Sequence, residues 1–275
     1  MTLHTALLEG AALLEEARVP ASRLTAEVLL AHAIRRGREY LYAHPEETLT
    51  ETGWIHYGRY LHQRLNGMPT QYVTGRQEFY GRMFRVTRDV LIPRPETEHV
   101  VEAALERIAS GALVLDVGTG SGALAVTLAL ETRCRAVASD ISAKALAVAR
   151  ANAARLEADV AFIEADLLEP FARHSIDVIV SNPPYVAMSE RESLQREVRD
   201  FEPSAALFSG PTGLECYERI VAGAATVLRP RGWLLLELGF RAAGPVEAML
   251  GSGWEDVALI PDLAGIPRVL AARRA

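Results

Sequence analysis

Hydrophobic residues in the first quarter of the chain recur at the spacing of α-helices. Between residues 2 and 67, apolar side chains return every three or four positions, and Pro20, Pro45 and Gly67 interrupt the pattern. This periodicity predicts a small helical bundle. Two roles remain open for it: docking of a macromolecular substrate, or covering of the main domain. The pattern is carried by Leu3, Leu7, Leu14, Leu24, Val28, Ile34, Trp54, Tyr57, Leu61 and Leu65.

The pattern changes near residue 77. Two short aromatic-rich runs flank Gly81 and predict a β-hairpin, and a helix with proline and acids in its first turn is predicted from Pro93 to about Ile108. Beyond it, runs of branched apolar residues alternate with helical stretches, as in an α/β sheet. The predicted divisions are an N-terminal helical domain (1–70), a linking β-hairpin (71–92) and an α/β domain (93–275).

Seven strands are expected in the α/β domain. Four strands come first, and the fourth of them is predicted to be a buried parallel strand. A fifth follows a helix at 214–228, and a closing pair follows a helix at 242–250. The stretch 200–213 is rich in Pro, Ser and Gly, and it is interpreted either as a wall of a substrate channel or as a surface loop. The strands are predicted at 113–117, 135–139, 160–164, 176–181, 233–238, 257–260 and 269–272.

The tetrapeptide Asn182-Pro183-Pro184-Tyr185 follows the predicted strand 176–181 directly. Proline has no N–H, and the residue before a proline is held extended, so strand pairing stops there and carbonyl groups become available. The Asn182 side-chain oxygen and the Pro183 carbonyl can accept both hydrogens of a planar NH₂ group, while the Tyr185 ring lies against its face. A primary amide or a base amino group fits this arrangement, although Asn-Pro is also a simple turn signal.

A second motif, Gly118-Thr119-Gly120-Ser121-Gly122, follows the predicted strand 113–117. Glycines let the backbone approach a ligand closely, and free N–H groups at the start of the next helix attract polar groups. Asp140 ends the following strand, where an acid can accept from both ribose hydroxyls. The pattern also fits a nicotinamide dinucleotide. Asp116 favours S-adenosylmethionine instead, because its charge opposes a pyrophosphate and suits the ammonium of a methionine moiety.

The end of the third predicted strand offers contacts for an adenine ring. Asp166 can accept from the adenine amino group, and Ile141 and Leu167 can present apolar faces to the ring. A turn or cap is the alternative interpretation of Asp166.

Charge and cysteine content narrow the possible partners. Formal net charge is +1 for residues 1–90 and −7 for 91–275, and an acidic main domain disfavours binding to the phosphate backbone of a nucleic acid.

The two cysteines, Cys134 and Cys216, are too few for a disulfide framework and lack metal-ligand spacing, so we expect buried thiols and no metal. Without a basic N-terminal region or an apolar run near 20 residues, a cytoplasmic protein with no membrane contact is expected.

Five motifs together closely resemble the peptide chain release factor glutamine methyltransferases, also called protein-(glutamine-N5) methyltransferases. Besides the two motifs above with Asp116-Val117, the resemblance is carried by Pro93-Arg94-Pro95-Glu96-Thr97-Glu98, Phe201-Glu202-Pro203 and Pro261-Asp262-Leu263-Ala264-Gly265.

The resemblance implies a seven-stranded, Rossmann-like class I S-adenosylmethionine methyltransferase domain with a small N-terminal helical domain. It implies methylation of the side-chain amide nitrogen of the glutamine in the Gly-Gly-Gln loop of release factors. Matched positions would make Gly118 to Gly122 the cofactor loop, Asp140 the ribose acid, and Asn182 to Tyr185 the glutamine clamp. Asp166 and Leu167 would contact adenine, although the family often has an aromatic residue where Leu167 stands.

Three other functions remain open from the sequence. The first is an amino-group methyltransferase acting on adenine or guanine in nucleic acid, which needs base extrusion and a strong phosphate-binding face. The others are a nicotinamide dehydrogenase and a docking protein that keeps its cofactor only structurally. We expect a monomer that binds release factors and does not bind nucleic acid directly.

Overall fold

The computed structural model describes residues 1–275, which form two compact units. The first unit comprises residues 1–76 together with residues 195–201, and the second comprises residues 77–194 and 202–275. A segment that follows the Asn-Pro-Pro-Tyr motif in sequence therefore belongs to the N-terminal unit. Among all the helices, none is both long and apolar enough to cross a membrane.

The first unit is helical, as the periodicity predicts. Leu14, Leu29, Leu30 and Tyr57 are among the fully buried side chains of its core. Leu24 and Trp54 are 45% and 43% exposed, so these two positions of the predicted apolar pattern are not core residues. The helices are α1 (Leu3–Glu16), α2 (Ser22–Ile34), α3 (Arg38–Ala43), α4 (Glu51–Leu65), α5 (Thr70–Thr74) and α9 (Arg196–Phe201).

Helix α9 is attached to this unit by an ion pair with a buried arginine. The Arg64 guanidinium of α4 is 2.7 Å from the Glu197 carboxylate, and the Arg64 side chain is only 8% exposed. Gly67 also packs here, because a Cβ at this position would lie 3.3 Å from Arg196 Nε and Phe201 Cε2. The segment 195–201 therefore packs within the helical unit.

The hairpin predicted around Gly81 is present as strands β1 (Arg76–Phe79) and β2 (Arg82–Arg85). Tyr80 and Gly81 both have positive φ, 49° and 71°, as a two-residue turn of type I′ requires. Phe79 and Phe84 pack edge to face, with ring centroids 6.0 Å apart, in the core of the second unit.

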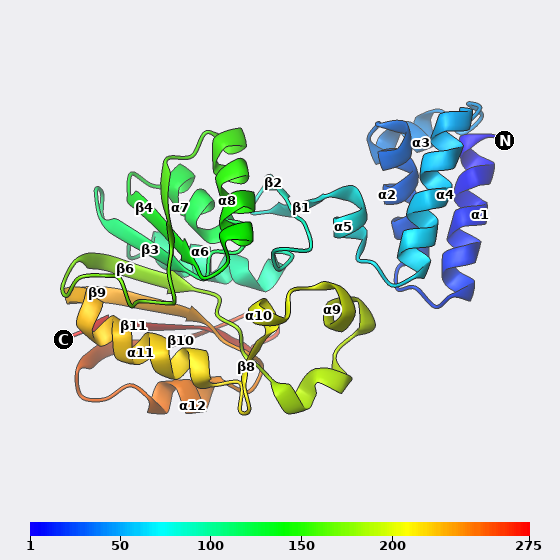
Figure 1. Cartoon of the computed structure of the whole chain (residues 1–275). Helices are drawn as coiled ribbons and strands as arrows, with labels where there is room; N and C mark the ends of the chain where they lie inside the picture. The colour runs from blue at the N-terminus through cyan, green and yellow to red at the C-terminus, as the bar shows by residue number, and fades with distance from the viewer. The chain divides into compact units, whose positions relative to one another are not determined.

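The second unit is built around the seven-stranded sheet, in the order β10-β11-β9-β6-β3-β4-β5 (Figure 1). Strands β9, β6, β3, β4 and β5 are parallel, and β11 runs antiparallel to both β9 and β10. The predicted strand count and the closing pair are confirmed. The strands are β3 (Leu113–Val117), β4 (Arg135–Asp140), β5 (Val160–Glu164), β6 (Ile176–Ser181), β9 (Leu228–Glu237), β10 (Trp254–Pro261) and β11 (Pro267–Arg274).

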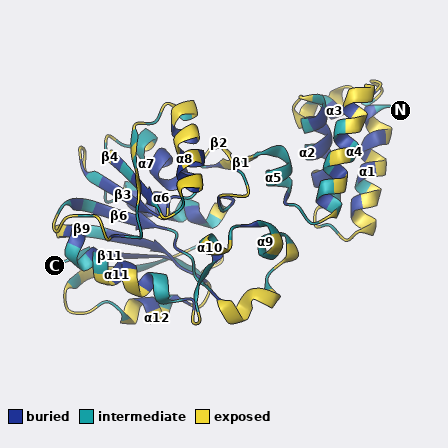
Figure 2. Ribbon diagram, in the orientation of Figure 1, coloured by how far each residue is buried: buried dark blue, intermediate teal, exposed yellow.

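Helices cover both faces of this sheet (Figure 1). One buried cluster joins the sheet to α6 (Glu98–Leu105), α7 (Ala123–Glu131) and α8 (Ala143–Leu156), and another joins it to α11 (Glu215–Val227) and α12 (Ala243–Ala248). The central strands are accordingly buried along most of their length (Figure 2). A strand buried on both faces must be apolar throughout, which explains the continuous apolar runs in the sequence.

The stretch 200–213 is more ordered than a loop. It contains the end of α9, helix α10 (Ser204–Leu207) and strand β8 (Phe208–Gly210), which pairs with β7 (Val186–Ala187). The 3-10 turn η2 (Met188–Ser193) follows β7, and a second one, η1 (Pro95–Thr97), precedes α6.

Candidate active site

The site lies where the connections of the parallel sheet change direction. After β3 the chain continues to β4 on one side, whereas β6 returns to the other side of β3. Val117 pairs with Ser181, and the Ser181 hydroxyl donates to the Val117 carbonyl at 2.6 Å, so the ends of β3 and β6 are held side by side. Ligands of open α/β sheets bind in the crevice at such a point. The glycine loop and the Asn182 motif begin at these two strand ends.

The glycine loop adopts backbone conformations that are unfavourable for residues with a side chain. Gly118, Gly120 and Gly122 all have positive φ, 71°, 55° and 83°. A Cβ on Gly122 would also lie 3.2 Å from the Ala149 Cβ of α8. No atom lies within 4 Å of a Cβ built on Gly118 or Gly120, so the first two glycines border open space. The loop thus leaves room for a ligand against its backbone.

Asp116 has a buried oxygen without a partner. Its Oδ2 accepts from Thr119 Oγ1 at 2.6 Å and from Ala125 N at 3.1 Å, whereas Oδ1 has no hydrogen bond although Asp116 is 1% exposed. Burial raises the pKa of this carboxyl to about 7. A buried oxygen of this kind is costly unless a ligand donates to it. The ammonium group of S-adenosylmethionine would supply such donors, so the residues present fit this cofactor.

Asp140 is fixed by the backbone around it. Its Oδ2 accepts from Gly120 N and its Oδ1 from Ser142 N, both at 2.9 Å, and burial raises its pKa. Each carboxylate oxygen has a second lone pair, so the side chain can still accept two ribose hydroxyls.

The predicted adenine contacts lie on the same cavity. Ile141 is 62% exposed, and Leu167 has a φ of 51°, which is unusual for a residue other than glycine. Asp166 carries a partner that the sequence did not predict, because its carboxylate is 2.9 Å from the Arg219 guanidinium of α11. One of its oxygens is therefore occupied by an ion pair, and the other remains for an adenine amino group.

Asn182 makes a single side-chain hydrogen bond. Its Nδ2 donates to Thr97 Oγ1 at 3.1 Å, and Thr97 in turn donates to Glu237 Oε2 at 2.6 Å. Thr97 and Glu237 are 4% and 3% exposed, and burial raises the pKa of Glu237 to about 7. The Asn182 Oδ1 atom accepts no hydrogen bond within the protein. It is available to a substrate donor.

Tyr185 is held between two glycines. A Cβ on Gly239 would lie 2.9 Å from the Tyr185 ring, and one on Gly213 would lie 2.6 Å from the Tyr185 carbonyl oxygen. Burial raises the pKa of the phenol to about 12, so it stays neutral. Of the tetrapeptide, Asn182 and Pro184 line the cavity beside the glycine loop, whereas Pro183 and Tyr185 do not.

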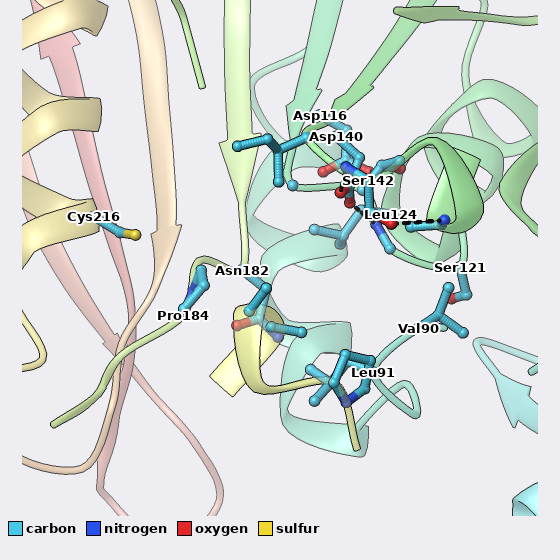
Figure 3. A pocket seen from close by; sticks show the side chains of 18 of the residues that line it. Val90, Leu91, Asp116, Ser121, Leu124, Asp140, Ser142, Asn182, Pro184 and Cys216 are labelled. Atoms are coloured by element: carbon cyan, nitrogen blue, oxygen red, sulfur yellow. Dashed lines mark hydrogen bonds between the residues drawn. The ribbon is translucent and has the colours of Figure 1, made fainter. Parts of the chain in front are cut away.

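The cavity has a volume of about 380 Å³, within the range of small-molecule sites. In Figure 3, Asn182 and Pro184 lie on one side, and Asp116, Asp140 and Ser142 lie on another. Cys216 also lines this cavity. Both cysteines are only partly buried, so the expectation that both are buried is wrong. Other lining residues that the sequence analysis did not single out include Val90, Leu91, Leu124, Ala145, Phe208 and Arg219.

The remaining family motifs are held by ion pairs and hydrogen bonds of their own. Glu202 accepts from Arg94 and, at 3.3 Å, from Ile92 N, which joins two of these motifs. Asp262 accepts from Arg268 Nε at 2.8 Å and from Ile266 N at 3.0 Å, closing the turn between β10 and β11. No group of three or more His, Cys, Asp or Glu side chains in the chain is arranged to hold a metal ion.

Comparison with known proteins agrees with this geometry. Residues 5–75 match the family described as PrmC N-terminal domain, and residues 97–200 match the Methyltransferase small domain. The chain is 46% identical to a release factor glutamine methyltransferase of Koribacter versatilis, an alignment that covers 100% of this chain and 99% of that protein. The chain belongs to the release factor glutamine methyltransferase family.

Other similarities support this assignment. A release factor glutamine methyltransferase of Bacillus subtilis is 41% identical, with 90% of each chain covered. Among solved structures, the hMettl16 catalytic domain in complex with the MAT2A 3′UTR hairpin 6 has a TM-score of 0.58 at 17% identity, covering 78% of this chain and 81% of that one. The latter similarity concerns the fold alone. The fold is that of class I methyltransferases, and S-adenosylmethionine is the cofactor of this family.

Proposed function

We propose that this protein transfers the methyl group of S-adenosylmethionine to the side-chain amide nitrogen of the glutamine in the Gly-Gly-Gln motif of peptide chain release factors. The supporting observation is the Asn182 amide: its Nδ2 is bound to Thr97 while its Oδ1 faces no protein donor. Together with the Pro183 carbonyl, this oxygen would accept both hydrogens of the substrate carboxamide.

Residues of the cofactor site have separate roles in this proposal. Asp116 Oδ1 binds the ammonium group, Asp140 binds the ribose hydroxyls, and the loop from Gly118 to Gly122 lets the backbone come close to the ligand. Asp166, Ile141 and Leu167 contact the adenine. When bound, S-adenosylmethionine supplies a methyl group on a sulfonium sulfur, which keeps the bonding electron pair when the amide nitrogen displaces it.

Substrate positioning is the main catalytic contribution of the chain. An amide nitrogen is a weak nucleophile because its lone pair is delocalised into the carbonyl group. Acceptance of both N–H bonds by Asn182 and Pro183 orients the nitrogen toward the methyl group and favours its pyramidal form in the transition state. The Tyr185 ring limits the position of the carboxamide plane. The methylated nitrogen then loses its proton to water, so no side-chain base is needed.

Radiolabelled methyl transfer tests the proposal. The protein is incubated with labelled S-adenosylmethionine and purified release factor, and incorporation is compared with a release factor whose motif glutamine is replaced by alanine. Label in the first substrate and none in the second is expected. Equal labelling of both, or labelling of DNA or RNA in their place, would overturn it.

Asn182→Ala provides the matched test of the site. We expect a fall in kcat of about 100-fold, since one of the two hydrogen bonds that position the substrate amide in the transition state is removed. The dissociation constant of S-adenosylmethionine should change by less than about threefold. An equal loss of turnover and of cofactor affinity would contradict the assigned role.

A further inference from the structure

The Asn182 amide has two ends of opposite hydrogen-bonding character. Its oxygen accepts and its NH₂ group donates, and the two ends are similar in size. A rotation of the amide by 180° would place donors against the donors of a substrate carboxamide. The clamp therefore works in only one orientation of Asn182, and something in the protein must select it.

Thr97 has the hydrogen-bonding capacity to make this selection. A hydroxyl group has one hydrogen and two lone pairs. With Glu237 ionised, the hydrogen of Thr97 is donated to Glu237 Oε2 at 2.6 Å, so only lone pairs remain for Asn182, and these can bind the NH₂ end but not the oxygen. Thr97 and Glu237 are both more than nine-tenths buried, where a mismatched pair of polar atoms is costly.

The sheet brings these residues together from distant parts of the sequence. Ser181 pairs with Leu236 on the parallel strands β6 and β9, so Asn182 and Glu237 occupy adjacent strand ends. Thr97 reaches the same place as the last residue of η1.

The backbone at Glu237 is also fixed. Tyr217 donates its hydroxyl to the Glu237 carbonyl at 2.8 Å, and Gly239 N donates to the Tyr217 hydroxyl at 3.1 Å. The charged groups that act on the Glu237 carboxyl are Glu96, Arg94 and Arg268. The backbone that carries this carboxylate is therefore held in place.

We propose that Thr97 and Glu237 are positioning residues: the Glu237 carboxylate orients the Thr97 hydroxyl, which fixes the Asn182 amide with Oδ1 toward the substrate. The inference rests on the proposed function of Asn182 as the carboxamide acceptor. It adds that the chemical direction of the clamp is set by two residues that act through Asn182.

Steady-state kinetics with a release factor tests this relay. Thr97→Val keeps the shape and removes the hydroxyl, and we expect kcat to fall about 10-fold to 100-fold while the cofactor dissociation constant changes by less than about threefold. Thr97→Ser should recover kcat to within about threefold of the wild type. In an Asn182→Ala background, Thr97→Val should cause no further loss. Unchanged kcat in Thr97→Val, or a full additional loss in the double variant, would overturn the proposal.

NMR provides a readout that does not depend on the substrate. The chain contains three asparagines, Asn66, Asn152 and Asn182, so selective ¹⁵N labelling gives three side-chain NH₂ signals, and loss of one in Asn182→Ala assigns it. We expect Thr97→Val and Thr97→Ala to shift the Asn182 signal and to leave the Asn66 and Asn152 signals in place. Thr97→Ala serves if the valine variant does not fold.

The two measurements separate the possible failures. A wild-type protein that does not methylate the Gly-Gly-Gln glutamine contradicts the proposed function, while a shifted Asn182 signal still supports the hydrogen-bond relay. An Asn182 signal that stays in place in both Thr97 variants overturns the relay even when the protein is an active methyltransferase.

Discussion

Gly239 lies directly against the ring of Tyr185. A Cβ built on Gly239 would be 2.9 Å from Tyr185 Cδ2 and 3.2 Å from Cγ, and the first of these distances is shorter than the contacts of Cβ atoms in folded proteins. The glycine that follows Leu238 beyond the end of β9 thus defines where the aromatic residue of the tetrapeptide can lie. Any larger residue there must move the ring.

Gly239→Ala is therefore expected to lower methyl transfer. Displacement of the Tyr185 ring should reduce kcat about 10-fold and lower the free energy of unfolding by about 1–2 kcal/mol, as overpacking usually does. Kinetics with a release factor and urea denaturation measure the two effects. Gly244→Ala in α12 is the control, because its added Cβ meets open space. Similar behaviour of the two variants would contradict the steric argument.

Asp116 is expected to make cofactor affinity depend on pH. Its pKa is raised to about 7, and the ammonium group binds the ionised form, so affinity should rise from pH 5 to 7. It should fall again above about pH 8, where a free α-amino group loses its proton.

Asp116→Asn should weaken S-adenosylmethionine binding about 10-fold to 100-fold and remove the rise between pH 5 and 7. Isothermal titration calorimetry at several pH values measures both. Asp159→Asn removes an exposed acid outside the cavity and serves as the control. A wild-type affinity that stays constant from pH 5 to 7 would argue against an ammonium contact.

The ion pair of Arg94 with Glu202 is expected to stabilise the second unit. The Glu202 side chain is 1% exposed, and Arg94→Ala would remove the guanidinium from a buried carboxylate. We expect a loss of about 1–3 kcal/mol in the free energy of unfolding, measured by urea denaturation. Arg229→Ala, which breaks an ion pair with Asp177 whose side chains are 44% and 29% exposed, should cost less than about 1 kcal/mol. Equal losses would show that burial of the pair is unimportant.

Glu237 is expected to make stability fall as pH rises. Burial raises its pKa from 4.5 to about 7, so the folded protein binds the proton more tightly than the unfolded chain. This contribution is complete below about pH 4.5 and is lost as pH rises through 7. Glu237→Gln removes it, so the difference in unfolding free energy between wild type and variant should decrease from pH 5 to 7. A difference that stays constant over this range in urea denaturation would contradict the assignment.

Local patterns in the sequence were sufficient to predict the seven strands of the main sheet and the two main motifs. The apolar runs predict the parallel strands, because strands covered on both faces must be apolar along their length. Gly118 and Asn182 could be placed at strand ends, since a glycine loop or a proline pair directly after such a run ends the pairing. Leu24 and Trp54 fit the helical period but are exposed. Periodicity predicts an apolar face of a helix, but it does not show how much of that face is buried in the core.

The sequence by itself determined which residues end the central strands. It therefore also determined which carboxylates and which side-chain amide lie at the strand ends, where the ligands bind. Only the tertiary structure decided which side chains complete the site. Asn182 and Glu237 meet because β6 and β9 pair in parallel. Thr97, which is separated from Glu237 by 140 positions, joins them because η1 and α6 pack against the same sheet. An isolated acid after Leu234, Leu235 and Leu236 was the one sequence signal for Glu237. Its partner could not be inferred, because strand register and helix packing are set by contacts between distant parts of the chain.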